Sequence, residues 1–337
     1  MLWKLEPSDE YMHPLETAEN FNESMYFNIY DPGKKTGGFF RIGNRANEGY
    51  AEMTTCLYLP DGSVAFMYNR PKIANNDAFD AGGMKFKVLE PFKKLNVSYE
   101  GKVVHLRNPV EMADPRKAFT ENPWLDCSVQ LEYTGLSPMY GGEPAEKKAP
   151  SSQAEAEMMN FAKGHYEQHI AGKGSFRVGD QSWEIDGFGL RDHSWGPRYW
   201  QSIWWYRWLT ANFGADFGFM VSVITLRDGT SVRSGMVFNE GRYDMILDND
   251  LKTEWTEGDW YHKKLLVTAK TERDTYEVEG TVLSMVPLRN QRKTPEGERL
   301  VTRITEGMTE WKCRGKLGYG LSEYLDQIVD GKPVGAA

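Results

Sequence analysis

The chain has 337 residues, of which 40% are hydrophobic and 26% charged, a composition typical of a folded globular protein rather than a disordered one. It carries 40 Lys and Arg against 48 Asp and Glu, which gives a formal net charge of −8. Because nucleic acids and anionic membranes bind basic surfaces, this balance argues against both as partners. The length allows two domains, or one large β domain.

Cysteine usage and the N-terminal sequence bear on the compartment. The three cysteines include no C-x-x-C pair, which argues against a zinc ribbon or a disulfide scaffold and fits a reducing environment. The first residues, MLWKLEPSDEYMHP, lack the apolar core of a signal peptide, and no uncharged apolar run reaches about 18 residues. We therefore expect a cytoplasmic protein without a membrane span.

In chain order, the sequence is mostly alternating apolar and polar runs joined by turn residues. Such runs flank five turn signals, at Pro60-Asp61-Gly62, Glu100-Gly101, Gly179-Asp180, Asp228-Gly229 and Arg273-Asp274. Alternation around residues of this kind predicts β-hairpins. Its repetition along the chain is typical of an all-β sandwich or barrel.

Helix signals are few. Good helix formers follow a capping serine over 151–163, and Ser322–Val329 is a candidate for a short C-terminal helix. The Gly-, Pro- and Lys-rich stretch over 141–153 predicts an exposed loop. We expect two β-rich domains, at 1–175 with a loop and helix insertion at about 141–163, and at 176–337.

The densest group of chemically active residues lies between Trp183 and Trp208, where six of the 11 tryptophans also occur. A cluster of charged and polar side chains among aromatics is costly to bury without partners, and a functional site is one reason to tolerate that cost. The residues concerned are Arg191, Asp192, His193, Ser194 and Arg198.

Asp192 and His193 support two interpretations. On a strand, neighbours point to opposite faces and cannot enter one pocket, whereas in an irregular turn they can. An aromatic pocket disfavours the ionised form of a carboxyl, which then serves as a general acid. The structural alternative is a corner in which Asp192 pairs with an arginine and Ser194 caps a turn. Ser194 as an acyl-transfer nucleophile is disfavoured, since no G-x-S-x-G elbow is present.

A second group is the segment His165-Tyr166-Glu167-Gln168-His169. On a helix its two histidines lie one turn apart, but the segment lacks the zincin order, in which Glu directly follows the first His. On a strand, His165, Glu167 and His169 share one face and could bind a metal ion. The alternative is a polar lining or an exposed strand face.

The aromatic side chains after residue 190 also have two interpretations. They are common core fillers in β-barrels, but they can equally line a cavity for a large apolar ligand and stabilise a passing carbocation. The candidate lining residues are Trp195, Tyr199, Trp204 and Trp205.

The stretch GFGLRDHSWGPR resembles a known family. The pattern Gly-x-Arg-Asp-His-Ser-Trp-Gly-x-Arg, from Gly189 to Arg198, is similar to that of the tandem lipocalin-like superfamily of carotenoid 1,2-hydratase and the lipocalin-type Diels–Alderases, and closest to its uncharacterised bacterial members. The Glu167-Gln168 pair and the pattern Gly318-x-Gly320-x-x-Glu323 are also similar. The resemblance implies two packed lipocalin-like β-barrel or sandwich domains. It also implies cofactor-independent chemistry on an isoprenoid or polyketide-like substrate.

Together these observations predict a lyase or isomerase, of the hydratase or cyclase type, acting on a C=C bond of a hydrophobic terpenoid- or polyene-like molecule. Asp192 is the expected general acid, His193 the group that orients it or activates water, and Glu167 the second candidate acid. We expect no cofactor and no metal, and a homodimer is possible. The alternatives are a non-catalytic carrier of an apolar ligand and a metal-dependent enzyme using His165, Glu167 and His169. The expected substrate-binding residues are Arg191, Trp195, Arg198, Tyr199, Trp204, Trp205 and Gln168.

Overall fold

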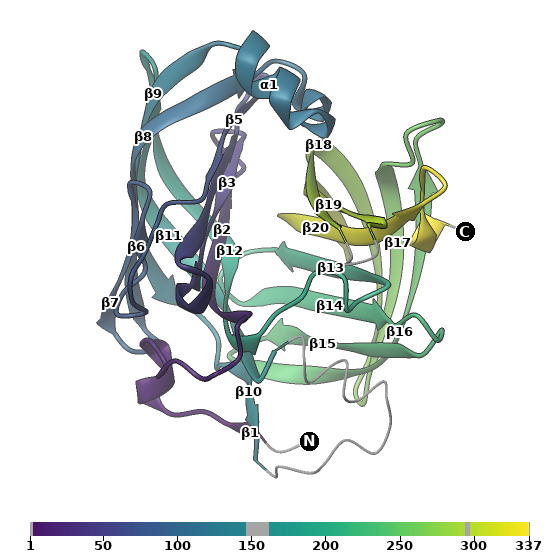
Figure 1. The fold of residues 1–337 in the computed structure, drawn as a ribbon. Helices are drawn as coiled ribbons and strands as arrows, with labels where there is room; N and C mark the ends of the chain where they lie inside the picture. Colours follow the sequence, from purple (N-terminus) through teal and green to yellow (C-terminus); the bar gives the residue numbers. More distant parts are fainter. Residues whose placement is uncertain (1–2, 146–161, 294–296, 337) are drawn as a thin grey trace. The chain divides into compact units, whose positions relative to one another are not determined.

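A computed structural model describes residues 3–145, 162–293 and 297–336, and it is built almost entirely of antiparallel strands (Figure 1). The all-β fold expected from the sequence is thus confirmed. The described residues contain one α-helix, α1 (Pro115–Glu121), and four short 3₁₀ helices: η1 (Pro7–Glu10), η2 (Ala46–Glu48), η3 (Pro109–Ala113) and η4 (Val334–Ala336). None of the helices in these ranges has the length and apolar character needed to cross a membrane.

The described chain divides into two compact units. The first comprises 3–108, 118–145 and 162–199, and the second comprises 109–117, 200–293 and 297–336. The first unit extends beyond the boundary expected at 175/176, because that position lies inside a strand, Gly164–Val178, which forms a hairpin with the next strand, Gln181–Pro197. Residues 146–161, which hold most of the expected loop and helix insertion, lie outside the described residues.

The first unit contains one twelve-stranded sheet. Its order is β1-β10-β11-β12-β2-β3-β4-β5-β8-β7-β6, and β9 pairs with both β8 and β11, which connects eight strands in a ring. The strands are β1 (Trp3–Lys4), β2 (Phe21–Asp31), β3 (Thr36–Arg45), β4 (Tyr50–Tyr58), β5 (Val64–Asn69), β6 (Asp80–Ala81), β7 (Met84–Glu90), β8 (Lys94–Leu106), β9 (Trp124–Gly135), β10 (Tyr140–Pro144), β11 (Gly164–Val178) and β12 (Gln181–Pro197).

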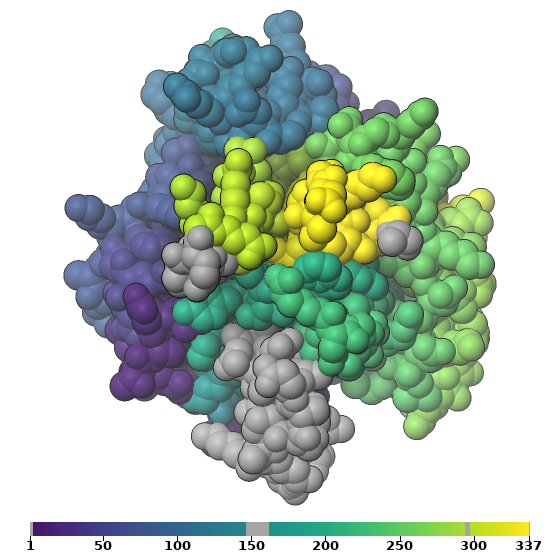
Figure 2. Space-filling view, turned by 45° about the vertical axis from the view of Figure 1, so that its right-hand side comes forward, coloured from purple at the N-terminus to yellow at the C-terminus, as the bar shows by residue number. Residues whose placement is uncertain are grey.

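The second unit is an eight-stranded up-and-down barrel, with β21 attached to its last strand. β13 pairs with β14 on one side and with β20 on the other, so the sheet closes on itself. The teal β13 and the yellow β20 lie side by side in Figures 1 and 2. The strands are β13 (Trp205–Asn212), β14 (Phe217–Thr225), β15 (Ser231–Asn239), β16 (Arg242–Trp255), β17 (His262–Thr271), β18 (Thr275–Lys293), β19 (Arg299–Cys313), β20 (Lys316–Val329) and β21 (Lys332–Pro333).

Four of the five expected hairpins are confirmed, and the fifth is wrong. Gly62 and Gly229 have φ angles of 85° and 87°, a left-handed conformation that glycine adopts without strain. In contrast, β8 runs straight through Glu100-Gly101, because it pairs with β9 along this stretch and leaves no room for a turn. The short helix expected at Ser322–Val329 is also wrong, since these residues belong to β20, which pairs with both β13 and β19.

One face of the first sheet packs on an apolar core, which we call the core face. On β2 and β3 it carries Phe27, Ile29, Phe40 and Ile42, all at most 1% exposed. Alternation along β2 places Met25 and Glu23 on this same face. The core face therefore changes from apolar to polar toward the start of β2, where the candidate site begins.

Candidate functional site

The hairpin of β11 and β12 carries both groups singled out in the sequence. Directly opposite residues are Tyr166 and His193, Glu167 and Asp192, and Gln168 and Arg191. Since side chains alternate across a strand, the motif is divided between two faces. The core face receives Arg191, His193, Trp195, Tyr166 and Gln168, while the opposite face receives Asp192, Ser194, His165 and Glu167.

This division decides between the two interpretations of Asp192 and His193. They lie on a regular strand, so His193 cannot orient Asp192. The His193 ring instead contacts Tyr166 Oη at 3.1 Å and Glu23 Oε1 at 2.9 Å. The expected role of His193 as a partner of Asp192 is therefore corrected by the strand geometry.

On the core face, Arg191 is fully buried and paired with a carboxylate that the sequence analysis did not identify. Its two terminal nitrogens donate to Glu10 Oε1 at 2.5 Å and Oε2 at 2.9 Å. Its Nε donates to Gln168 Oε1 at 2.9 Å, and Gln168 Nε2 donates to two backbone carbonyl groups. Burial lowers the pKa of Arg191, but the charges of Tyr166 and Glu10 outweigh it, so the net shift is upward. Arg191 and Gln168 thus hold the N-terminal segment rather than face an open cavity.

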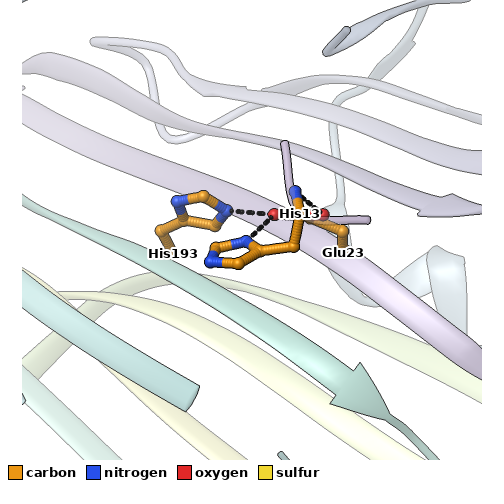
Figure 3. A group of neighbouring side chains, drawn as sticks. All are labelled: His13, Glu23 and His193. Atoms are coloured by element: carbon orange, nitrogen blue, oxygen red, sulfur yellow. Dashed lines mark hydrogen bonds and ion pairs between the residues drawn. The ribbon is translucent and has the colours of Figure 1, made fainter. Parts of the chain in front are cut away.

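Glu23 is the centre of the second polar group on the core face (Figure 3). Its Oε1 contacts His193 Nε2 at 2.9 Å and His13 Nδ1 at 2.6 Å. Its Oε2 accepts from the His13 backbone N–H at 2.8 Å and from Asn76 Nδ2 at 2.7 Å. Burial raises the pKa of Glu23, but the bonds from both histidines outweigh it and bring the pKa to about 2. The side chain is therefore an anion at neutral pH.

Trp195 completes this group. The His13 ring stacks on it with centroids 4.0 Å apart, and its indole N–H donates to Glu143 Oε1 at 2.9 Å. Trp195 is 1% exposed, so it acts here as a packing residue with a satisfied N–H.

On the opposite face, a histidine lies between two carboxylates. His165 Nε2 is 3.7 Å from Glu167 Oε1 and 3.6 Å from Asp192 Oδ2. Burial lowers the pKa of His165, but its interaction with Asp192 and the charge of Glu167 outweigh this and raise it above the usual value. The His165 side chain is 42% exposed, Asp192 23% and Glu167 fully buried. This group combines a proton donor with two carboxylates at a surface that a ligand can reach.

Ser194 and Arg198 lie next to this group. Arg198 Nη2 donates to Ser194 Oγ at 2.9 Å, and Ser194 Oγ lies 3.0 Å from Ser24 Oγ on the neighbouring strand. The positive charge of Arg198 also lowers the pKa of His165.

The remaining expected lining residues are elsewhere. Tyr199 is 37% exposed at the end of the first unit, and Trp204 and Trp205 belong to the second. Trp204 lies under the Arg227 guanidinium, and Trp205 lines a cavity of about 80 Å³ with Arg207. That volume holds only a few water molecules and is too small for a terpenoid.

Sequence reasoning missed Glu10, His13 and Glu23, and it considered His165 as a metal ligand or as part of a polar strand face, but not as an acid. The predicted strand pattern does place His165, Glu167 and His169 on one face. Among the described residues, however, the group whose ligand atoms all lie within 4.8 Å of one another is His13, Glu23 and His193. The motif on β12 includes His193, but no motif marks His13 and Glu23, which come to it from a distant part of the chain.

Comparisons with known proteins agree with the architecture. The chain is similar to a putative AttH from Nitrosomonas europaea, with 12% identity and a TM-score of 0.53 over 93% of this chain and 96% of that one. It is similar to CghA, solved with Sch210972, with 10% identity and a TM-score of 0.50 over 93% of this chain and 90% of that one. It is also similar to kievitone hydratase from Nectria haematococca, with 9% identity and a TM-score of 0.54 over 90% of this chain and 88% of that one. These similarities confirm the expected tandem lipocalin-like fold.

A search of curated proteins finds no match. The family described as a domain of unknown function, DUF7064, matches residues 6–328, which is nearly the whole chain. The chain belongs to the DUF7064 family.

Proposed function

We propose that this protein is an enzyme that protonates a C=C bond of a hydrophobic small molecule, with His165, Asp192 and Glu167 as the acid–base group. The observation that carries the proposal is a partly exposed histidine whose pKa is raised by two carboxylates. The neighbouring carboxylates favour the protonated form of the imidazole, and a positioned imidazolium suits general acid catalysis.

The proposed reaction uses these residues in sequence. The N–H bond of the His165 imidazolium breaks and a C–H bond forms on the substrate, which leaves a carbocation on the adjacent carbon. In a hydratase, water oxygen bonds to that carbon and its released proton passes to the Asp192 carboxylate and back to His165. In an isomerase, the cation instead loses a neighbouring proton to the His165 imidazole, which restores the imidazolium. In a cyclase, a second double bond first bonds to the cationic carbon, and the new cation then loses a proton to His165. The two carboxylates stabilise the positive charge throughout.

Two further features support this assignment. Arg198 and Ser194 provide hydrogen-bond donors beside the acid–base group, which could hold an oxygen atom of the substrate. One protein of the same fold is named a hydratase, which agrees with water addition as the first reaction to test. Terpenoids and polyenes are the proposed substrate class, as the sequence motif suggested.

The test is product analysis by mass spectrometry in H₂¹⁸O, with a panel of monoterpenes, longer isoprenoids, steroids and polyenes. A product heavier by one labelled water supports the hydratase. A product of unchanged mass with a new retention time supports the isomerase or cyclase. Specific retention of one panel member without any product would contradict the proposal and favour a carrier.

Variants then assign the residues. His165→Gln and Asp192→Asn are expected to lower kcat by about 100-fold or more, since general acid–base catalysis contributes about 10²–10⁴-fold. The matched control is His105→Gln, because His105 lies in the same unit and bonds only Ser63 among the described side chains. A control as inactive as the two site variants would show that the loss is not specific.

A further inference from the structure

The group around Glu23 belongs to a chain of four hydrogen-bond links on the core face. In order, the links join Glu10 Oε1 to Tyr166 Oη (2.9 Å), Tyr166 Oη to His193 Nδ1 (3.1 Å), His193 Nε2 to Glu23 Oε1 (2.9 Å) and Glu23 Oε1 to His13 Nδ1 (2.6 Å). Glu10, Glu23 and His193 are fully buried, so water cannot compensate for a missing proton at their links.

A count of protons shows that this series of hydrogen-bond links lacks one proton, and with it one positive charge. Four links need four protons, but with ionised carboxylates and neutral imidazoles the chain supplies three, from the Tyr166 hydroxyl and one nitrogen of each histidine. If Tyr166 donates to Glu10 and His193 Nδ1–H donates to Tyr166, the Nε2 lone pair of His193 faces the Glu23 carboxylate. A cation at that position is needed to make the contact favourable.

A second mismatch lies at the other end of the chain. When His13 Nδ1–H donates to Glu23, its Nε2 carries a lone pair, yet that atom lies 3.6 Å from Asp9 Oδ1 and has no hydrogen-bond partner. An additional proton on His193 would allow its Nε2 to donate to Glu23, but His13 Nε2 would still carry a lone pair toward Asp9. A metal ion bound by His13 Nδ1, His193 Nε2 and Glu23 Oε1 would satisfy both, because His13 would then carry its proton on Nε2, toward Asp9.

The donor set and its surroundings fit such an ion. Two imidazole nitrogens and one carboxylate oxygen form a common ligand set for Zn²⁺. Each ligand also has an outer partner of the kind that orients metal ligands: Tyr166 on His193, Asp9 near His13, and Asn76 on Glu23. The His13 and His193 rings are further held by stacking on Trp195 and by an edge contact with Phe79.

We infer that His13, Glu23 and His193 form a binding site for a first-row divalent metal ion, with Zn²⁺ as the preferred probe. The ion fastens the N-terminal segment, which carries Glu10 and His13, to β2 and β12. The site lies on the core face, away from His165 and Asp192, so the inference is independent of the proposed reaction.

The test is a zinc titration of the purified full-length protein after removal of metals with a chelator. The expected result is uptake of one equivalent with a Kd below about 1 μM, measured by competition with a chromophoric chelator, and a higher unfolding temperature of the loaded protein. If the stripped protein takes up no saturable equivalent and its unfolding temperature does not respond to zinc, the inference is wrong and a proton supplies the charge.

Variants locate the bound ion. Glu23→Gln and His193→Gln are expected to abolish the tight equivalent. Asp9→Asn, at a partly exposed position, is expected to weaken it by about 10–100-fold. The control His165→Gln should leave zinc affinity unchanged. Loss of binding in this control instead would place the metal on the opposite face of the sheet and overturn the assignment.

Discussion

The two units each bury a histidine beside a tyrosine and an arginine, but the partners of the two histidines differ. In the first unit, His193 contacts the Glu23 carboxylate at 2.9 Å. In the second, the hydrogen-bond partners of His262 among the described residues are neutral, with Nε2 at 2.9 Å from Ser322 Oγ and Nδ1 at 3.2 Å from Thr305 Oγ1. Burial, and then the charge of Arg207, lower the pKa of His262 to about 3. The comparison teaches that two similarly buried imidazoles differ in their neighbours, a carboxylate for His193 and hydroxyl groups for His262.

The largest loss of stability is expected when the carboxylate partner of a buried arginine beside one of these histidines is removed. Glu10→Ala leaves Arg191 without the carboxylate it pairs with in the described part of the chain and is expected to lower the free energy of unfolding by about 3–5 kcal/mol. Asp326→Ala should cost less, about 1.5–3 kcal/mol, because Arg207 also donates to three backbone carbonyl groups. Urea unfolding of both variants measures the difference, and equal losses would contradict this ranking.

The second prediction concerns acid. Since the pKa of His262 is about 3 in the folded protein and 6.5 is its ordinary value, the unfolded chain binds one proton more between these pH values. His262 therefore lowers stability as the pH falls from about 6.5 toward 3, with a slope of up to about 1.4 kcal/mol per pH unit. Unfolding measured across this range should show a shallower slope in His262→Gln. An unchanged slope would mean that His262 is not held neutral.

The third prediction extends the comparison to His165, whose neighbouring carboxylates raise its pKa. If His165 is the acid, kcat/KM falls as the pH rises through that pKa, because the imidazolium is lost. Removing one carboxylate lowers the pKa, so Asp192→Asn should move this alkaline limb to lower pH in addition to reducing the rate. If kcat/KM of the Asp192→Asn variant falls at the same pH as that of the wild type, His165 is excluded as the titrating group.

The smallest loss of stability is expected for an exposed ion pair on the hairpin of β11 and β12. Lys173 Nζ and Asp186 Oδ2 are 2.9 Å apart, but their side chains are 74% and 69% exposed. Asp186→Ala should therefore change the free energy of unfolding by less than about 1 kcal/mol, against the much larger loss for Glu10→Ala. A loss as large as that of Glu10→Ala would show that burial does not govern these pairs.

Local patterns in the sequence were sufficient for the fold class and most hairpins. Alternation and turn residues predicted the antiparallel sheets, but they left open whether Asp192 and His193 lie on a strand or in an irregular turn. Where a strand continues through the local signal because it pairs with a neighbour, as β8 does with β9 at Glu100-Gly101 and β20 does with β19 at Ser322–Gln327, tertiary pairing outweighs that signal. Such pairing cannot be read from a short window of sequence.

The candidate sites were only partly predictable for a related reason. The motif on β12 identified Arg191, Asp192 and His193, but the partners that define their roles are far away in the sequence. Glu10 is 181 residues from Arg191, and Glu23 is 170 residues from His193. A carboxylate in an N-terminal segment without a recognisable motif carries no signal of such a contact.

The pairing of β13 with β20 has a consequence for how the second barrel forms. Trp205 pairs with Asp326, so the contact that closes the barrel joins residues more than a hundred positions apart. Forming such a contact requires closing a long loop before the pairing can compensate for the lost chain entropy, and topologies rich in these contacts fold slowly. During synthesis, the barrel cannot close until its eighth strand, β20, has been made. Until then the edge of β13 is unpaired and exposed to other chains.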